Sequence, residues 1–190
     1  MPQKPILIDS NSYFRLARYI HPFLNKPIFS NTYRLYIVKE LEDEYRKSKR
    51  LMVKFDWVYE EQFVENRKVG IITIPKKKKE DIKIAYDIIH SVKKEKNFST
   101  QYYDIHSLAI AHVFEIGIVT DDKDMLHLAN IFKIKKYNTI QLLKKLHLNR
   151  DIGIEDVKNI ICRWKKENDL PSNCKKDYEK YFNDNFDELE

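Results

Sequence analysis

Four acidic residues each stand where an apolar segment of this chain begins or ends. They are far apart in the sequence: Asp9, Glu40, Asp104 and Asp122. A carboxylate beside apolar side chains is costly unless it is paired or binds a cation. If folding brings the four together, they repel one another unless one is protonated or a cation lies among them. Because hard oxygen ligands select Mg²⁺ or Mn²⁺, we predict a carboxylate centre for one or two such ions.

Such a centre indicates a particular reaction. A bound divalent cation can turn water into a nucleophile, and a second cation can stabilise the leaving oxygen of a phosphodiester. Cys162 and Cys174 lack the paired spacing of zinc ligands. His106 and His112 lie in a helical pattern with a packed face, where a structural histidine is the simpler interpretation. The residues therefore favour metal-assisted phosphodiester hydrolysis.

The predicted acids have simpler interpretations and close competitors. Asp9 and Asp104 would also serve as helix N-caps. Glu42 and Glu44 follow Glu40 in one charged helix, where a solvated face is the ordinary explanation for acidic residues. We prefer Glu40 as the ligand because it directly follows an apolar run.

A second choice arises in the acidic turn after the apolar pair 118–119. Asp121, Asp122 and Asp124 would also form an ordinary polar turn. We assign the ligand role to Asp122 and an auxiliary role to Asp124, in preference to Asp121.

The apolar patterns predict the elements that position these acids. Short continuous runs predict buried strands at residues 6–8, 35–38, 118–119 and 131–134, with a further short strand at 71–74. Helical spacing predicts helices at residues 12–24, 80–96, 104–116, 139–146, 154–167 and 175–187. Strands alternating with helices indicate an α/β fold with a mostly parallel sheet. Open sheets of this kind bind ligands beyond the C-terminal strand ends, where the acids stand.

Composition sets the wider frame. The chain has 190 residues, a formal net charge of +6 and a pI near 9.1, so a polyanion is a reasonable partner. No stretch of 18 consecutive apolar residues occurs. Two isolated cysteines fit a reducing compartment. We expect a soluble cytoplasmic protein without a membrane partner.

Basic and aromatic residues offer candidate nucleic-acid contacts. The run Lys76–Lys79 is more typical of a solvated loop than of a binding site. Four aromatic residues are candidates for stacking on bases: Trp57, Tyr59, Tyr102 and Tyr103. Packing within the protein is the simpler interpretation for each of them.

The acidic motifs, taken in order, resemble those of the PIN-domain ribonucleases. Ile6-Leu7-Ile8-Asp9-Ser10-Asn11 is similar to the family's opening strand and turn, and Val38-Lys39-Glu40-Leu41 to its second motif. Asp104 followed by Ser107-Leu108-Ala109 resembles the third, and Val119-Thr120-Asp121-Asp122-Lys123-Asp124 the fourth. The resemblance covers roughly residues 5–148.

The resemblance implies roles for individual residues. It makes four of them catalytic metal ligands: Asp9, Glu40, Asp104 and Asp122. It makes Asp124 a fifth, auxiliary metal ligand, and it gives supporting roles to Ser10, Asn11 and Thr120.

The resemblance also implies an architecture and an activity. It predicts a three-layer α/β/α domain over residues 1–148, with a helical extension over 149–190 packed on the same domain. The implied activity is Mg²⁺- or Mn²⁺-dependent hydrolysis of single-stranded RNA. The extension is similar to that of some PIN proteins that act as the toxin of a toxin-antitoxin pair. That class would have an antitoxin protein as partner and would form homodimers.

Other functions remain open at this point. The same fold without catalysis would give an RNA-binding or assembly module, and a PIN-like structure-specific DNA nuclease would place a helical arch within residues 51–97. A phosphotransfer receiver domain would need a second acid where Ser10 stands. A haloacid-dehalogenase-type phosphatase would need an aspartate at Asn11.

Overall fold

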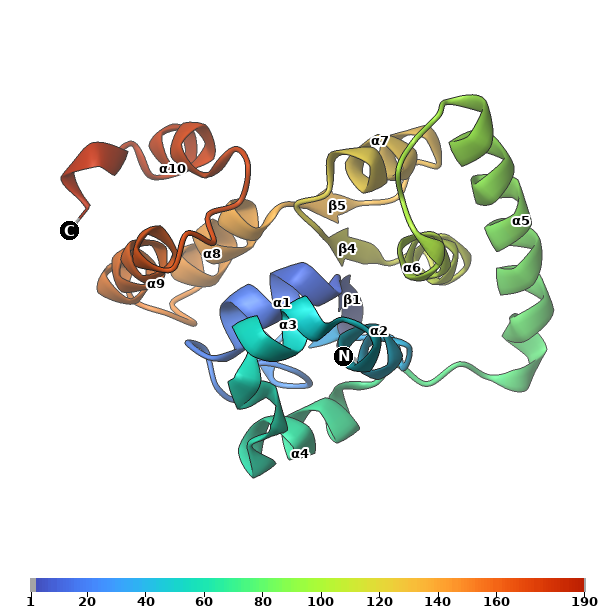
Figure 1. The fold of residues 1–190 in the computed structure, drawn as a ribbon, viewed down its shortest axis with the longest axis horizontal. Helices are drawn as coiled ribbons and strands as arrows, with labels where there is room; N and C mark the ends of the chain where they lie inside the picture. Colours follow the sequence, from blue (N-terminus) through green and yellow to red (C-terminus); the bar gives the residue numbers. More distant parts are fainter. Residues whose placement is uncertain (1–2, 190) are drawn as a thin grey trace.

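A five-stranded sheet organises the chain, whose computed structural model describes residues 3–189 (Figure 1). The strand order is β2-β3-β1-β4-β5. β1 pairs in parallel with β3 and β4, β4 pairs in parallel with β5, and only β2 runs antiparallel to its neighbour. The strands are β1 (Lys4–Ile8), β2 (Pro27–Ile28), β3 (Tyr33–Tyr36), β4 (Gly117–Val119) and β5 (Lys136–Tyr137). The predicted α/β class with a mostly parallel sheet is confirmed.

Helices cover both faces of the sheet because neighbouring side chains of each strand point to opposite sides. On one face, Ile6 and Ile8 of β1 enter a core with helices from both ends of the chain. These helices are α1 (Ser10–Ala17), α2 (Leu41–Lys47), α3 (Lys49–Lys54), α4 (Glu61–Gly70), α8 (Thr139–Leu148), α9 (Ile154–Lys166) and α10 (Cys174–Phe182). Three short 3-10 turns complete the chain: η1 (Asp56–Tyr59), η2 (Lys76–Lys78) and η3 (Phe186–Glu188).

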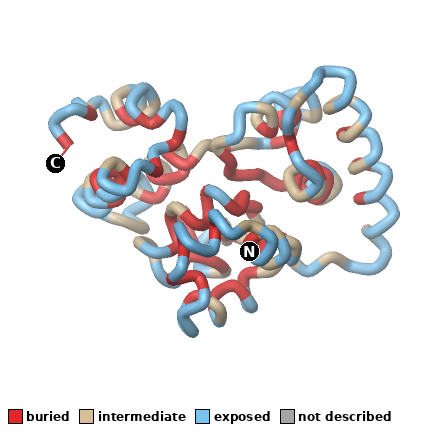
Figure 2. Tube along the Cα trace, viewed as in Figure 1, coloured by how far each residue is buried: buried red, intermediate tan, exposed pale blue. Residues whose placement is uncertain are grey.

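Leu7 enters the core on the other face. Its helices are α5 (Lys79–Glu95), α6 (Tyr102–Val113) and α7 (Lys123–Ile131). Figure 2 shows buried residues running through β1, β4 and α6, while the outer helix α5 is largely exposed. α5 packs mainly on α6, so α6 lies between it and the sheet.

The C-terminal helices share a core with the N-terminal part of the chain. Trp164 of α9 is fully buried, and its indole N–H donates to the carbonyl of Arg15 in α1 at 3.0 Å. Val157 and Tyr178 belong to the same buried cluster as Ile6. Residues 149–189 therefore pack directly against the helices that follow β1; Met1, Pro2 and Glu190 lie outside the described residues.

The strand order changes direction at the central strand β1. From β1 the chain passes to β3 on one side and later reaches β4 on the other. A reversal of strand order of this kind opens a ligand-binding crevice at the C-terminal strand ends. Asp9 and Thr120 follow directly after β1 and β4 at that edge.

Three predicted elements differ from the structure. The predicted strand at 131–134 is wrong: α7 runs to Ile131, and the Ile134 N–H donates back to the carbonyl of Ala129 at 2.8 Å. Lys133 adopts a positive φ of 56°, as is usual in a helix-ending turn. The strand at 71–74 reduces to one bridge, Ile37 with Ile71. The helix predicted at 12–24 begins at Ser10 and ends at Ala17.

Within residues 3–189, no helix is both long and apolar enough to cross a membrane.

Candidate active site

Asp9 is the innermost acid of the sheet edge. Its backbone N–H donates to the carbonyl of Val119 at 2.9 Å, which fixes it between β1 and β4. The residue is only 8% exposed. Burial is the largest cause that raises its pKa well above the ordinary value, followed by the negative charges of Asp104, Glu44 and Asp121. Asp9 is therefore a buried carboxyl group surrounded by other carboxylates.

Asp104 approaches the same point from the opposite helix layer. It lies in the first turn of α6, where its Oδ2 accepts from the Gln101 N–H at 2.7 Å. Burial raises its pKa to about 6; the Gln101 hydrogen bond opposes this shift, and the charges of Asp122 and Glu44 add to it. The hydrogen bond from Gln101 holds the Asp104 side chain at the start of α6, within range of the charges of Asp122 and Glu44.

Among the glutamates of the charged run, Glu44 is the one whose charge acts on Asp9 and Asp104. Ser10 donates its hydroxyl to Glu44 Oε2 at 2.6 Å, and the Glu44 charge raises the pKa of both Asp9 and Asp104. Glu40 precedes α2, and four residues correspond to about 6 Å along a helix axis. The two glutamates therefore meet different neighbours.

Glu40 contacts a different residue, His106 of α6. Its Oε1 lies 3.3 Å from His106 Nδ1, and this contact is the largest cause that lowers the Glu40 pKa. Glu42, the third acid of the run, forms an ion pair with the buried Arg67. Each glutamate of the charged run thus has a different partner.

The acidic turn after β4 also separates into three roles. Asp122 is exposed, accepts from the Met125 N–H at 2.7 Å as the N-cap of α7, and raises the pKa of Asp104. Asp124 accepts from the backbone and hydroxyl of Ser99 at 2.7 and 2.8 Å, which lowers its pKa. No described interaction connects Asp124 with Asp9 or Asp104.

Asp121 turns towards the C-terminal extension. Its Oδ2 lies 3.0 Å from Arg15 Nη1, and its Oδ1 accepts from the Thr139 N–H at 2.9 Å. Its charge still contributes to the raised pKa of Asp9. Asp121 therefore borders the acidic group while being neutralised by a cation of the protein.

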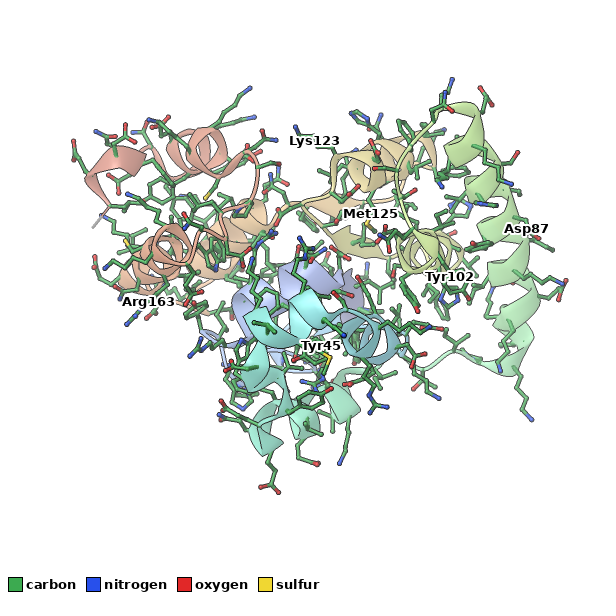
Figure 3. All side chains as sticks on the ribbon, viewed as in Figure 1. Tyr45, Asp87, Tyr102, Lys123, Met125 and Arg163 are labelled. Atoms are coloured by element: carbon green, nitrogen blue, oxygen red, sulfur yellow. The ribbon has the colours of Figure 1, made fainter. Side chains whose placement is uncertain are left out.

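Two of the three predicted supporting residues make supporting contacts. Thr120 is fully buried, its hydroxyl lies 3.4 Å from Asp9 Oδ2, and it accepts from the Asp122 N–H at 3.1 Å. Met125, labelled in Figure 3, is also fully buried, and its sulfur lies 3.4 Å from the same hydroxyl. Ser10 orients Glu44. Asn11 is exposed, and its side chain makes no described hydrogen bond.

The acids at the sheet edge have no cationic partner among residues 3–189. Among residues 3–189, no Lys, Arg or His nitrogen lies within 4.0 Å of the carboxylates of the acid cluster, by which we mean Asp9, Glu44, Asp104 and Asp122. The donor set fits a hard divalent cation, because all four groups supply carboxylate oxygen. Within that same range, no three His, Cys, Asp or Glu side chains form a ready-made metal shell. A cation would therefore have to draw the side chains inwards.

Comparisons of the chain with protein-family models, with curated proteins and with solved structures found no match. The site is therefore interpreted from its own geometry alone.

Proposed function

We propose that this protein is a divalent-metal-dependent nuclease that hydrolyses phosphodiester bonds of single-stranded RNA. One observation carries the proposal: burial and the charges of neighbouring carboxylates raise the pKa of Asp9 and of Asp104 at the C-terminal edge of a parallel sheet, and among residues 3–189 no Lys, Arg or His nitrogen lies within 4.0 Å of either carboxylate. Like charges this close destabilise the site unless a cation is bound or protons are taken up. Mg²⁺ or Mn²⁺ is the partner that suits carboxylate oxygen.

The cluster residues hold this centre in different ways. Asp9 and Asp104 are fixed by the strand end and the helix cap, while Glu44 is oriented by Ser10. Asp122 stands at the exposed rim, where a substrate phosphate approaches. A divalent cation held there supplies the activation of water and the charge stabilisation of the leaving oxygen. The basic remainder of the surface attracts the RNA backbone.

The motif order supports a PIN-like relationship as part of the proposal. In that relationship Glu44 takes the role that the sequence pattern gave to Glu40. The toxin of a toxin-antitoxin pair, with an antitoxin partner, a homodimeric state and a cytoplasmic location, is the biological setting that the same resemblance favours.

A second candidate function is a catalytically silent RNA-binding module. The observation in its favour is that the acids do not stand in a ready-made metal shell within residues 3–189. Such a module would bind RNA equally well with and without divalent cations.

Cleavage of a labelled single-stranded RNA with Mn²⁺ or Mg²⁺ tests the proposal. We expect metal-dependent cutting that Asp9→Asn and Glu44→Gln abolish. Glu40→Gln should leave kcat for cleavage unchanged. Asp87→Asn is the matched control, because Asp87 is exposed on the outer helix α5 (Figure 3). RNA binding without cutting under either metal would favour the silent module, and full activity of Asp9→Asn would exclude the proposed centre.

A further inference from the structure

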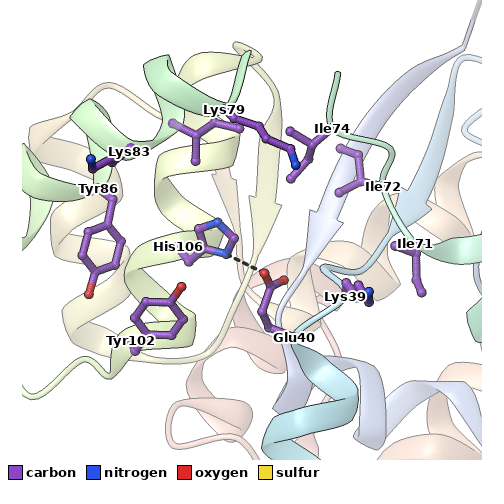
Figure 4. Close-up of a pocket in the computed structure, with 11 residues that line it drawn as sticks. Lys39, Glu40, Ile71, Ile72, Ile74, Lys79, Lys83, Tyr86, Tyr102 and His106 are labelled. Carbon is purple, nitrogen blue, oxygen red and sulfur yellow. Dashed lines mark ion pairs between the residues drawn. The ribbon is translucent and has the colours of Figure 1, made fainter. Parts of the chain in front are cut away.

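A pocket of about 500 Å³ opens between α5, α6 and the segment 71–74 (Figure 4). Its floor is apolar, with Ile72, Ile74 and Ile82 among its residues, and two tyrosines, Tyr86 and Tyr102, form one wall. Ile82 is buried, but Tyr102 is 55% exposed, so a large aromatic surface remains open to a ligand.

The charges around this pocket are mostly positive. Three lysines line it, Lys39, Lys79 and Lys83, and all three are exposed. The one carboxylate, Glu40, lies 3.3 Å from His106 Nδ1, a contact drawn as the dashed line in Figure 4. An apolar, aromatic cavity with a cationic rim complements a ligand that combines a flat base with phosphate groups.

The pocket and the acid cluster share two helices. On α6, Tyr102 and His106 line the pocket, and Asp104 lies between them in sequence. On α2, Glu40 at the N-terminus faces the pocket, and Glu44 one turn later faces the acids. The N-terminal ends of α2 and α6 therefore carry both pocket residues and acids, with Asp104 on another side of α6 from Tyr102 and His106.

The aromatic wall is arranged for stacking. The rings of Tyr102 and His106 are nearly parallel, at 16° with centroids 5.9 Å apart, and Tyr86 lies 5.4 Å from Tyr102. Aromatic side chains bind unpaired bases by stacking, whereas bases within a duplex are hidden from such a pocket. The His106 contact also holds Glu40 as an acceptor for base N–H groups.

We infer that this pocket binds one unpaired nucleotide of a single-stranded substrate next to the scissile phosphate. Tyr102 stacks on the base, and Lys79 and Lys83 contact the adjoining phosphates. This inference rests on the proposed nuclease function, because it assigns the pocket as the substrate subsite of the same centre.

Fluorescence anisotropy of the full chain with a labelled single-stranded RNA of about a dozen nucleotides tests the inference in EDTA. We expect Tyr102→Leu to raise Kd about tenfold or more, the effect of losing one stacked base. Tyr59→Leu is the matched control, because Tyr59 is 49% exposed and lies outside the pocket. An abasic oligomer of the same length should bind both variants equally.

A second pair of variants tests the phosphate contacts. Lys83→Gln should weaken RNA binding and reduce the slope of log Kd against log salt by about one. Lys94→Gln is the matched control, since Lys94 is exposed on the same helix, 11 residues or about 16 Å further along. Equal slopes for the two variants would remove Lys83 from the subsite.

The outcomes separate this inference from the proposed activity. Tyr102-dependent RNA binding without metal-dependent cutting would support the pocket and exclude the nuclease. Cutting that requires Asp9, with equal RNA binding by Tyr102→Leu and Tyr59→Leu, would support the nuclease and overturn the pocket. A Tyr102→Leu change that altered self-association in sedimentation but not RNA binding would also overturn it, because the pocket would then be a contact between two copies of the chain.

Discussion

Two buried aspartates of this protein have almost the same exposure and opposite electrostatic surroundings. Asp9, at the sheet edge, is 8% exposed, and Asp169, in the C-terminal extension, is 6% exposed. Asp169 lies 3.2 Å from Arg15 Nε and 2.5 Å from Lys54 Nζ. Asp9 has no such partner within residues 3–189 and faces further carboxylates instead.

The difference separates an acid that holds the fold together from an acid that the fold tolerates. Asp169, with its two cations, connects the extension to α1 and α3. Asp9 and Asp104 carry the opposite signature, a raised pKa caused by burial and like charges. Perturbed groups of this kind are typical of functional sites. The acid cluster should therefore cost stability and give activity, whereas the paired acids should do the reverse.

The largest expected effect is on catalysis by Asp9→Asn. We expect a loss of about a hundredfold or more in RNA cleavage, because a ligand of the centre is removed. In EDTA the same variant should melt at a higher temperature than the wild type, since one buried charge and its repulsions are gone. Cleavage kinetics and calorimetry check both effects. A lower melting temperature together with full activity would show that Asp9, like Asp169, stabilises the fold and is not part of the metal centre.

Bound metal should produce the next largest effect. Mn²⁺ at about 100 times its Kd should raise the free energy of unfolding by roughly 2.7 kcal/mol, because it binds only the folded cluster. Thermal melts of wild type and Glu44→Gln, with and without Mn²⁺, measure this, and the variant should show a much smaller rise. Equal stabilisation of both proteins would place the metal elsewhere.

Asp169→Asn should act in the opposite direction to Asp9→Asn. The variant leaves Arg15, of which 18% of the side chain is exposed, with Asp121 as its one anionic partner among residues 3–189. We expect a loss of about 2 kcal/mol in the free energy of unfolding, below the cost of breaking a fully buried pair because Lys54 is 38% exposed. Urea denaturation measures it.

The control for this variant is Asp187→Asn, whose ion pair with Lys175 is exposed. Loss of that pair should leave the free energy of unfolding nearly unchanged, because solvent screens both charges. If both variants had equally small effects, the contacts of Asp169 would not hold the extension in place.

The sequence predicted the edge of the sheet better than the details of its acids. Apolar runs that end abruptly in Asp9 and Asp122 follow from the burial of parallel strands, so the strand ends and their convergence were readable. The choice between Glu40 and Glu44 depended on where α2 begins and on which side chains surround each glutamate. No local pattern supplies those neighbours, because Ser10 and His106 come from distant parts of the chain.

The pairing of Asp121 illustrates the same limit. Its cationic partner Arg15 is 106 residues away, so no local pattern separates Asp121 from Asp122 by charge neutralisation. The predicted strand at 131–134 failed for a different reason. A short apolar run has no distinctive period. Residues 131–134 form the end of α7 and the turn that follows it instead of a strand.

The smallest expected effect is the pH dependence of stability without metal. The pKa of Asp104 is raised from the ordinary 3.8 to about 6, so the folded state binds more protons than the unfolded state between these values. The free energy of unfolding should therefore fall as pH rises from about 4 to 6, by on the order of 1 kcal/mol for this partly exposed group. In Asp104→Asn, whose amide oxygen can still accept from Gln101, this part of the fall should be absent.

Urea denaturation in EDTA at a series of pH values measures this difference. Asp169→Asn should leave the fall in place, because it does not change the acid cluster. With saturating Mn²⁺ the wild-type slope should reverse, since protons compete with the cation for the same oxygens. Parallel curves for wild type and Asp104→Asn would show that Asp104 does not share the repulsion that sets the cluster apart from the paired acids.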